Sequence, residues 1–352
     1  MIESNQVYIA IDLHSKHSKM GYMNEQGEYL GQQGMQTTAQ NLIGGVVRIP
    51  AARKFLTLEQ GNMAFWAAER LRGYVDELIV CDPRQNHLIS RSMVKNDDRD
   101  TYQLCQLLRL GALKPVWRPK RMGDRRLFYH QIKEYQRLNK ALTTNKRQLQ
   151  AMLRHWGYNQ KLTKADYARP EPILDQITPA GLAREVEAKF THIDMIARAK
   201  HEQFERITQA GRGYPEIIQF QKMSGMGPVG AHTFSGYIQT PYRFQRRGQL
   251  IRFCQLAVRK ASSDGRRLRA ERLSKAGHGP LKNVAHTVWK SAMKSPNEVS
   301  GFYQASLARC GDPVKARLNT QRKILITLWS IWKHNQTYSA QKFFCAGGDS
   351  PR

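Results

Sequence analysis

Acidic side chains are scarce in this sequence. Its 28 Asp and Glu stand against 56 Lys and Arg, which leaves a formal net charge of +28 and a pI near 10.2. A positive excess on this scale attracts polyanions and is typical of proteins that bind nucleic acid. The excess is concentrated after Gly211, where 24 basic residues face only six acids. We therefore expect the C-terminal part of the chain to lie closest to phosphate groups.

Cysteines and long apolar runs are also sparse. The five cysteines are widely separated and show no C-x-x-C spacing, which argues against a disulfide framework and against a structural zinc site. No uninterrupted apolar run approaches the roughly 18 residues of a membrane-spanning helix, and the N-terminus lacks a basic segment followed by an apolar one. We expect a cytoplasmic protein without a membrane partner. The G-x-x-x-x-G-K-[ST] motif of nucleotide hydrolases is missing as well.

The first third of the sequence alternates strand-like apolar runs with segments of helical periodicity. The expected strands are residues 7–13, 55–58 and 78–81, and the expected helices are residues 63–71 and 102–110. Strands that alternate with helices predict an α/β sheet domain. Pro115 and Pro119 interrupt any helix, so we place the end of this domain at residue 117.

The middle segment, residues 118–210, is expected to be helical. Its apolar residues return at heptad-like spacing over 128–156 and again over 186–207, with a proline-containing break at 170–179. Two long amphipathic helices joined by a turn form either an antiparallel coiled-coil arm or part of an ordinary helical bundle. The spacing alone leaves both arrangements open.

The basic part of the chain covers residues 211–345 and is followed by a polar, glycine-containing tail at 346–352. It opens on Met223–Thr233, where Gly225 and Gly227 precede a new helix. Because glycine has no Cβ, backbone amides in such a turn can approach a phosphate closely. We interpret these two glycines as nucleic-acid contacts.

Carboxylates in the first third form a candidate metal site. Asp12 and Glu59 each end a strand-like run, and strand ends are where open α/β sheets build their sites. Asp97 and Asp100 share one face of a predicted helix start, whereas Asp98 points elsewhere. Such oxygen ligands favour Mg²⁺, which neutralises charge on a scissile phosphodiester. Helix capping by the aspartates and a strand-end turn at Asp12 are the alternative roles.

In this order and spacing, the motifs resemble those of the IS110-family insertion-sequence transposases and the related IS1111 group, which are DEDD recombinases. The N-terminal motifs are Ile11-Asp12, Leu58-Glu59 and the Lys-x-Asp-x-x-Asp of Lys95, Asp97 and Asp100. The C-terminal motifs are Ser224-Gly225-Met226-Gly227, an aromatic-rich helix at Phe253–Leu256, Ser262-Ser263-Asp264-Gly265, and Ser274-Lys275-Ala276-Gly277-His278. The resemblance covers nearly the whole chain.

The resemblance implies three domains and a set of partners. The domains are a RuvC-like (RNase H-like) α/β N-terminal domain, a helical coiled-coil linker, and a mainly α-helical C-terminal transposase domain with a catalytic serine. It implies that Asp12, Glu59, Asp97 and Asp100 are the catalytic DEDD residues that bind Mg²⁺. The implied partners are donor and target DNA, a non-coding guide (bridge) RNA, and further copies of the chain, as a dimer that becomes a tetramer in synapsis. Such a protein would be associated with the bacterial nucleoid.

The resemblance also selects one of two adjacent serines. The family nucleophile lies about seven positions after the Leu of Gly-Leu-x-Pro and about twelve before the Lys of Ser-Lys-x-Gly. Counted from Leu256 and from Lys275, both positions fall on Ser263. This chain departs from the family pattern in having Gln255-Leu256-Ala257-Val258 for Gly-Leu-x-Pro, and Asp264 for the Gly that follows the serine.

A serine hydroxyl is a poor nucleophile unless it is activated and aimed. The basic residues around it can bind phosphate and stabilise a pentacovalent transition state. They are Arg259, Lys260, Arg266, Arg267, Arg269, Arg272 and Lys275. Attack by Ser263 would leave a 5′-phosphoserine and a free 3′ hydroxyl, so rejoining would need no ATP. Without the resemblance, both serines would be interpreted as turn residues in a loop that coats DNA.

The sequence therefore predicts a transposase or site-specific DNA recombinase, and two other functions remain open. A RuvC-like metal-dependent nuclease that resolves DNA junctions by hydrolysis would need the carboxylates and not the serine. A non-enzymatic packaging protein would need only the basic part. A covalent protein–DNA adduct separates the first function from the other two.

Overall fold

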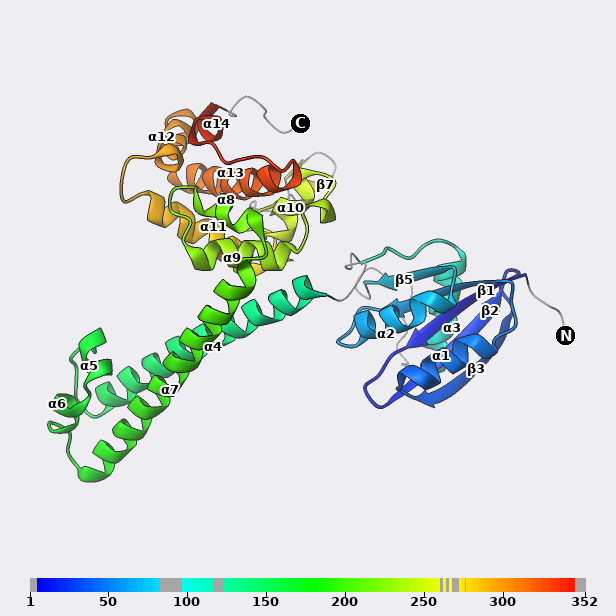
Figure 1. Ribbon diagram of the computed structural model, residues 1–352, viewed down its shortest axis with the longest axis horizontal. Helices are drawn as coiled ribbons and strands as arrows, with labels where there is room; N and C mark the ends of the chain where they lie inside the picture. Colours follow the sequence, from blue (N-terminus) through cyan, green and yellow to red (C-terminus); the bar gives the residue numbers. More distant parts are fainter. Residues whose placement is uncertain are drawn as a thin grey trace. The chain divides into compact units, whose positions relative to one another are not determined.

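The computed structural model divides into two compact units, residues 1–122 and residues 123–352. The residues that it describes are 5–82, 97–116, 123–259, 262–263, 266–267, 272–275 and 277–345. Figure 1 shows the first unit in blue to cyan and the second in green to red. Among the described helices, none has the length and apolar character needed to cross a membrane.

A five-stranded mixed sheet forms the centre of the first unit. Its order is β3-β2-β1-β4-β5, where β1 pairs antiparallel with β2 and parallel with β4. The strands are β1 (Gln6–Asp12), β2 (His17–Asn24), β3 (Tyr29–Gln36), β4 (Arg53–Glu59) and β5 (Glu77–Cys81). The three strands expected from the sequence are β1, β4 and β5. The edge pair of β2 and β3 was not expected.

Helices cover both faces of this sheet because β1 is apolar at every position of its interior. Val7, Ile9 and Ile11 pack with α1 (Ala39–Arg48) and α2 (Ala64–Leu71), whereas Ala10 packs with α3 (Asp97–Arg109). A short 3-10 helix, η1 (Arg72–Tyr74), follows α2. The expected combination of an α/β N-terminal region with a mostly helical C-terminal region is confirmed. The more specific RNase H-like assignment stays a prediction.

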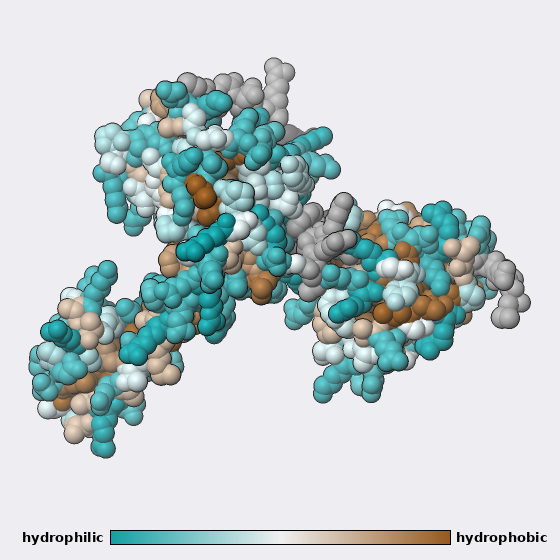
Figure 2. All heavy atoms as spheres, in the orientation of Figure 1, coloured by the Kyte–Doolittle hydropathy of each residue, from teal (hydrophilic) through white to brown (hydrophobic). Residues whose placement is uncertain are grey.

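The second unit begins with two long helices, α4 (Asp124–His155) and α7 (Ala180–Gly211), which run side by side (Figure 1). Their apolar contacts gather at two places. Leu149 of α4 packs with Val186 of α7 at one end, where α5 (Lys164–Ala168) and α6 (Glu171–Leu174) lie, and Ile132 shares a core with Ile207 at the other. The helices are therefore antiparallel and form an arm. Figure 2 shows mostly hydrophilic atoms along the visible face of this arm.

The remainder of the second unit is a helical body with one apolar core. Its elements are α8 (Pro215–Gln221), α9 (Pro228–Ile238), η3 (Pro241–Arg243), α10 (Arg247–Phe253), α11 (Gly279–Ala292), α12 (Glu298–Cys310), α13 (Pro313–Lys333) and α14 (Ala340–Cys345). Asn297 and Asp312 cap α12 and α13 through their side-chain oxygens. Phe128 and Ile132 of α4 belong to the same core as Phe220 of α8. The base of the arm is therefore part of the body.

One expected helix is wrong in its bounds. The aromatic-rich helix was expected at Phe253–Leu256, but α10 ends at Phe253 and Gln255 adopts a left-handed φ of 58°. A residue in that region cannot continue a right-handed helix. Four two-residue strands follow instead, β6 (Val258–Arg259), β7 (Ser262–Ser263), β8 (Arg266–Arg267) and β9 (Arg272–Leu273).

Candidate functional site

Asp12 and Glu59 end two neighbouring parallel strands of the first unit. The register pairs Ile11 with Leu58, so each carboxylate residue comes next along its strand. Ile11 and Leu58 both pack against α1 and α2. Because successive side chains of a strand point to opposite faces, Asp12 and Glu59 face the side of the sheet that α3 covers.

The direction of α3 brings its first turn toward the same end of β1. The guanidinium of Arg109, the last residue of α3, donates to the Glu25 carbonyl oxygen at 3.4 Å, in the turn between β2 and β3. Since β2 is antiparallel to β1, that turn lies beside the start of β1. The opposite end of α3, with Asp97 and Asp100, therefore lies toward the end of β1, where Asp12 is.

The candidate metal ligands are only partly described. Asp100 is half-buried, and the adjacent Thr101 is fully buried with its hydroxyl 3.0 Å from the Tyr29 hydroxyl. The side chain of Asp97 lies outside the described part of the chain. Within the described residues, no three His, Cys, Asp or Glu side chains gather closely enough to hold a metal ion. A metal site at this edge of the sheet therefore stays a prediction.

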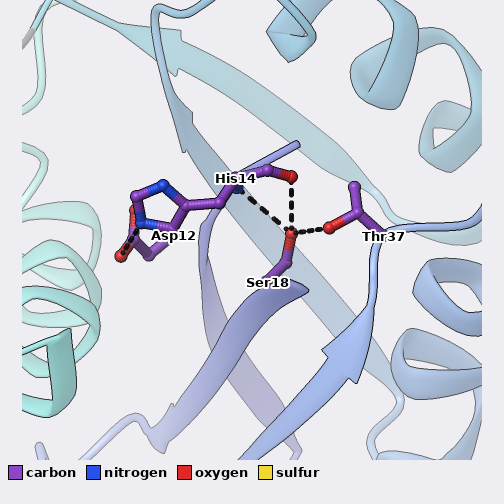
Figure 3. A network of polar contacts seen from close by, with 4 residues as sticks. All are labelled: Asp12, His14, Ser18 and Thr37. Carbon is purple, nitrogen blue, oxygen red and sulfur yellow. Dashed lines mark hydrogen bonds and ion pairs between the residues drawn. The ribbon is translucent and has the colours of Figure 1, made fainter. Parts of the chain in front are cut away.

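His14 is a residue of this edge that the sequence did not single out. Its Nε2 lies 3.1 Å from Oδ2 of Asp12, and Figure 3 shows the two side chains in contact. The backbone amide of His14 donates to Ser18 Oγ at 3.3 Å, and Ser18 Oγ lies 2.7 Å from Thr37 Oγ1. The loop after β1 is thus fixed to the start of β2. The available signal was the position of His14, two residues after a strand-end aspartate.

The serine segment forms a narrow antiparallel ribbon in the second unit. β6 pairs with β9, and β7 pairs with β8, so that Ser263 is opposite Arg266 and Ser262 is opposite Arg267. Directly opposite residues of an antiparallel pair share one face of the ribbon. Since Ser262 and Ser263 are adjacent in a strand, they lie on opposite faces. The register therefore separates the two serines and gives each one an arginine position on its own face.

The other predicted nucleic-acid contacts of the ribbon are described to different extents. Arg259 and Arg272 are paired with each other across β6 and β9, and Lys275 is exposed just beyond β9. Lys260, Arg269 and Asp264 lie outside the described residues. So do the side chains of both serines and of the ribbon arginines, and their roles stay predictions.

Hydrogen bonds at the base of the ribbon join its two ends. The Gln255 side-chain Nε2 donates to the carbonyl oxygens of Lys275, at 2.7 Å, and Gly277, at 3.0 Å. The His278 amide donates to the Phe253 carbonyl oxygen at 2.7 Å. Gly277 has a φ of 123°, and a Cβ there would collide with that same carbonyl group. Glycine at this position therefore allows the close approach of the two chain segments.

A neutral histidine packs under the ribbon base. The His278 ring lies 4.4 Å from the Phe253 ring and 5.5 Å from the Tyr237 ring, measured between centroids. Burial, together with the positive charges of Arg243 and Lys133, lowers the pKa of His278 to about 4. Burial also lowers the pKa of Arg243 to about 10, which leaves its guanidinium charged. At neutral pH the imidazole of His278 is thus uncharged, whereas the guanidinium of Arg243 near it is positively charged.

The two glycines of the predicted phosphate turn have different surroundings. Gly225 has a φ of 83° and packs so closely on α11 that a Cβ would meet the Val288 carbonyl oxygen, whereas a Cβ at Gly227 would meet nothing within 4 Å. Both glycines line a cavity of about 640 Å³ together with residues of α4, α9 and α11. Packing therefore explains the glycine at 225, and the backbone of Gly227 is the more accessible of the two.

Glu298 fixes the start of this turn. Its carboxylate accepts from the Ser224 amide at 2.9 Å, from the Ser224 hydroxyl at 2.7 Å and from the Tyr338 hydroxyl at 2.6 Å. Burial alone would raise the pKa of Glu298, but the hydrogen bonds from Tyr338 and Ser224 outweigh burial and hold it below its usual value. The charged carboxylate therefore ties the turn to α12 and to the segment before α14.

The comparisons with known proteins bear on this second unit. The family model described as Transposase IS116/IS110/IS902 family matches residues 219–304. The matched segment contains the glycine turn, the ribbon with both serines, and the Lys275–His278 segment. The carboxylates of the first unit lie outside it. No curated protein matches the chain.

Proposed function

We infer that this protein, a member of the IS116/IS110/IS902 transposase family, cuts and rejoins DNA strands with Ser263 as its nucleophile. The observation that supports this proposal is the match of the family over the ribbon, where the register gives Ser263 an arginine position, Arg266, on its own face. Transposition acts on DNA, and the charge of the chain fits a polyanionic substrate.

The proposed reaction exchanges one phosphate ester for another. The Ser263 oxygen attacks the phosphorus, a serine–phosphate bond forms, and the bond to the 3′ oxygen breaks. The hydroxyl proton leaves the serine and the 3′ oxygen gains one. A 3′ hydroxyl of another strand then attacks the 5′-phosphoserine and regenerates the free serine. The guanidinium groups of the ribbon arginines would stabilise the charge that develops on the phosphate.

The carboxylates of the first unit are proposed as the second catalytic group. Oxygen donors from two strand ends and one helix turn are the ligands that Mg²⁺ prefers. When bound by Asp12, Glu59, Asp97 and Asp100, Mg²⁺ would neutralise charge on the scissile phosphate. In the described structure Oδ2 of Asp12 lies 3.1 Å from His14 Nε2. A carboxylate has about four lone-pair sites, so Asp12 could bind the ion and keep that contact.

Nucleic-acid partners beyond the DNA follow from the family resemblance. We propose that a non-coding guide RNA directs the protein to donor and target DNA, and that dimers pair as tetramers in synapsis. The basic excess after Gly211 provides the charge that would hold these polyanions. Binding should therefore weaken steeply as salt rises, since each neutralised phosphate releases counterions.

Trapping of the covalent intermediate tests the proposal. The full chain would be incubated with Mg²⁺, guide RNA and a nicked DNA substrate that carries its recombination site, and the adduct would be digested for mass spectrometry. The expected result is DNA attached through a 5′ phosphate to Ser263. Cleavage without any adduct would identify a hydrolytic nuclease instead. An adduct on another residue would refute the role of Ser263.

A further inference from the structure

A second cavity of the helical body lies away from the glycine turn. It has a volume of about 570 Å³ and is formed where α9 ends, at η3, and at the C-terminal end of α13. Its lining includes the buried residues Glu216 and Phe220 and the exposed residues Tyr242 and Asn335. The cavity therefore has a closed floor and an open, partly aromatic rim. Its volume lies within the range of small-molecule sites.

Gln239, in the wall of this cavity, has a strained backbone. Its φ and ψ are 65° and −41°, and the Thr240 amide donates to the Ile238 carbonyl oxygen at 2.8 Å. These features define a γ-turn with positive φ at its centre, a rare and strained turn for a residue with a side chain. Strain of this kind persists where the surrounding structure over-determines it, and it is concentrated at ligand sites.

The side chain of Gln239 also lacks a partner. Its Oε1 is buried and, among the described residues, accepts no hydrogen bond. A buried acceptor without a donor is unfavourable, so such groups are usually completed by another molecule or by water. Because Oε1 itself is buried, it meets a ligand in the cavity only after the side-chain amide turns by 180°, which exchanges Oε1 with Nε2.

Flat side chains also line the cavity, among them those of Arg125 and Trp332. Arg125 pairs with Glu216 at 2.6 Å and donates to Ser235 Oγ at 2.8 Å, which fixes its guanidinium over the Tyr214 ring at 3.8 Å. The same guanidinium lies 5.2 Å from the centre of the Trp332 ring, another residue of the lining.

Tyr242 lies at the rim and is 72% exposed. Its hydroxyl donates to the Lys333 carbonyl oxygen at 3.3 Å, which holds the ring in place. Planar rings and guanidinium groups are the side chains on which nucleobases stack.

We propose that this cavity binds one unpaired nucleobase of a polynucleotide, stacked on the Tyr242 and Trp332 rings, with a base N–H donating to Gln239 Oε1. The inference rests on the proposed function, because it takes nucleic acid as the ligand. Every base carries an N–H donor on its Watson–Crick edge, and pairing in a duplex occupies that edge. The site therefore selects single-stranded or extruded bases, in DNA or in RNA, and excludes bases within a duplex.

Binding of three probes to the full-length protein tests the site. The probes are a single-stranded DNA of about 12 nucleotides, the RNA of the same sequence, and the blunt duplex of that DNA. The variant Gln239→Gly removes the acceptor and relieves the positive-φ strain. It should weaken binding of at least one single strand about tenfold, leave duplex binding within about twofold, and raise the thermal midpoint by about 2 °C. The strand that responds identifies the source of the base.

Two further variants distinguish binding in the cavity from a change in stability and from the loss of an exposed aromatic ring elsewhere. Tyr242→Ala, at an exposed position, should weaken binding of the same single strand without a gain in stability. Trp156→Ala removes a ring that is 51% exposed beyond the end of α4 and should change neither affinity. Unchanged single-strand binding in both cavity variants, or an equal loss on the duplex, overturns the proposal. If the cavity proposal fails in this way, an adduct on Ser263 would still support the proposed function. Cavity-dependent binding of single strands without any adduct would instead support the cavity and refute Ser263 as the nucleophile.

Discussion

The side-chain amide of Gln255 donates to the carbonyl oxygen of Lys275 at 2.7 Å and so joins the two ends of the serine ribbon. Gln255 itself adopts a left-handed φ of 58°. The family pattern has glycine at this place, and glycine adopts positive φ without steric cost. In this chain glutamine adopts the positive φ, and its side chain adds hydrogen bonds that glycine cannot make.

The first prediction concerns this bond. Gln255→Gly should change the free energy of unfolding by less than about 1 kcal/mol, because relief of the left-handed strain offsets the loss of two hydrogen bonds. Backbone amides at the ribbon base, those of Ser274 and His278, should exchange with solvent several-fold faster, and adduct formation should slow by a similar factor. Hydrogen exchange and adduct kinetics measure the two effects. Unaltered exchange at both amides would contradict the proposed role of the side chain.

The second prediction separates the two serines. Ser263→Ala should bind nucleic acid normally and form no covalent adduct, because it lacks the attacking oxygen. Ser262→Ala should retain measurable recombination, since adjacent positions of a strand alternate between its two faces and the hydroxyl would contribute at most a hydrogen bond of about 1 kcal/mol. Each variant serves as the control for the other in a gel assay of the adduct. Loss of the adduct only in Ser262→Ala would assign the nucleophile to the opposite face.

The third prediction concerns the carboxylates. Alanine at Asp12, Glu59, Asp97 or Asp100 should lower the Mg²⁺-dependent cleavage rate by a factor of 100 or more, on the order of one lost catalytic electrostatic contact, with DNA binding retained. Asp98→Ala is the matched control, because one residue along a helix turns the side chain by about 100° away from the face of Asp97. Cleavage at the wild-type rate by Asp97→Ala would remove that residue from the metal site.

The fourth prediction is a loss of stability in acid. Since the pKa of His278 is about 4 in the folded protein and near 6.5 when exposed, the unfolded chain binds more protons between these values. The contribution of His278 to the free energy of unfolding is therefore complete above about pH 6.5, and it is lost as the pH falls toward 4. At pH 5 we expect the wild type to have lost about 1–2 kcal/mol through this group. Burial lowers the pKa of His232 as well, which adds a loss of the same sign.

Urea unfolding at pH 7.5 and pH 5 measures this effect. His278→Gln should show a smaller difference between the two pH values than the wild type, because it lacks the titrating ring. His192→Gln provides the control, since the His192 side chain is exposed on α7. An equal difference in the wild type and in His278→Gln would mean that other groups cause the acid loss.

The sequence predicted the parts of the fold that carry strong apolar patterns. β1, β4 and β5 are apolar and partly β-branched, and the spacing of Phe128, Ile132 and Tyr135 in α4 gave the long helix. β3 was missed because it alternates half-buried and exposed residues and contains glycines and glutamines. Its place at the sheet edge depends on its partner β2, which a local pattern does not reveal.

The candidate site was predictable where topology follows from strand order. Adjacent parallel strands bring Asp12 and Glu59 to one edge, and that consequence holds without knowledge of side-chain contacts. The contact of His14 with Asp12 and the bond of Gln255 to Lys275 were not predictable, because they depend on loop conformations. The pairing of Ser263 with Arg266 required a strand register that two-residue strands do not specify by pattern.

The arm has a mechanical consequence. α4 contains 32 residues, so it is about 48 Å long, and its two ends are embedded in different apolar clusters. A continuous helix resists bending, so α4 acts as a lever with its short end in the helical body. A tilt of about 5° at Phe128 displaces the far end, near Leu153, by about 3 Å. A molecule that binds the arm near Leu153 therefore exerts torque on the apolar core of the helical body, which also supports the serine ribbon.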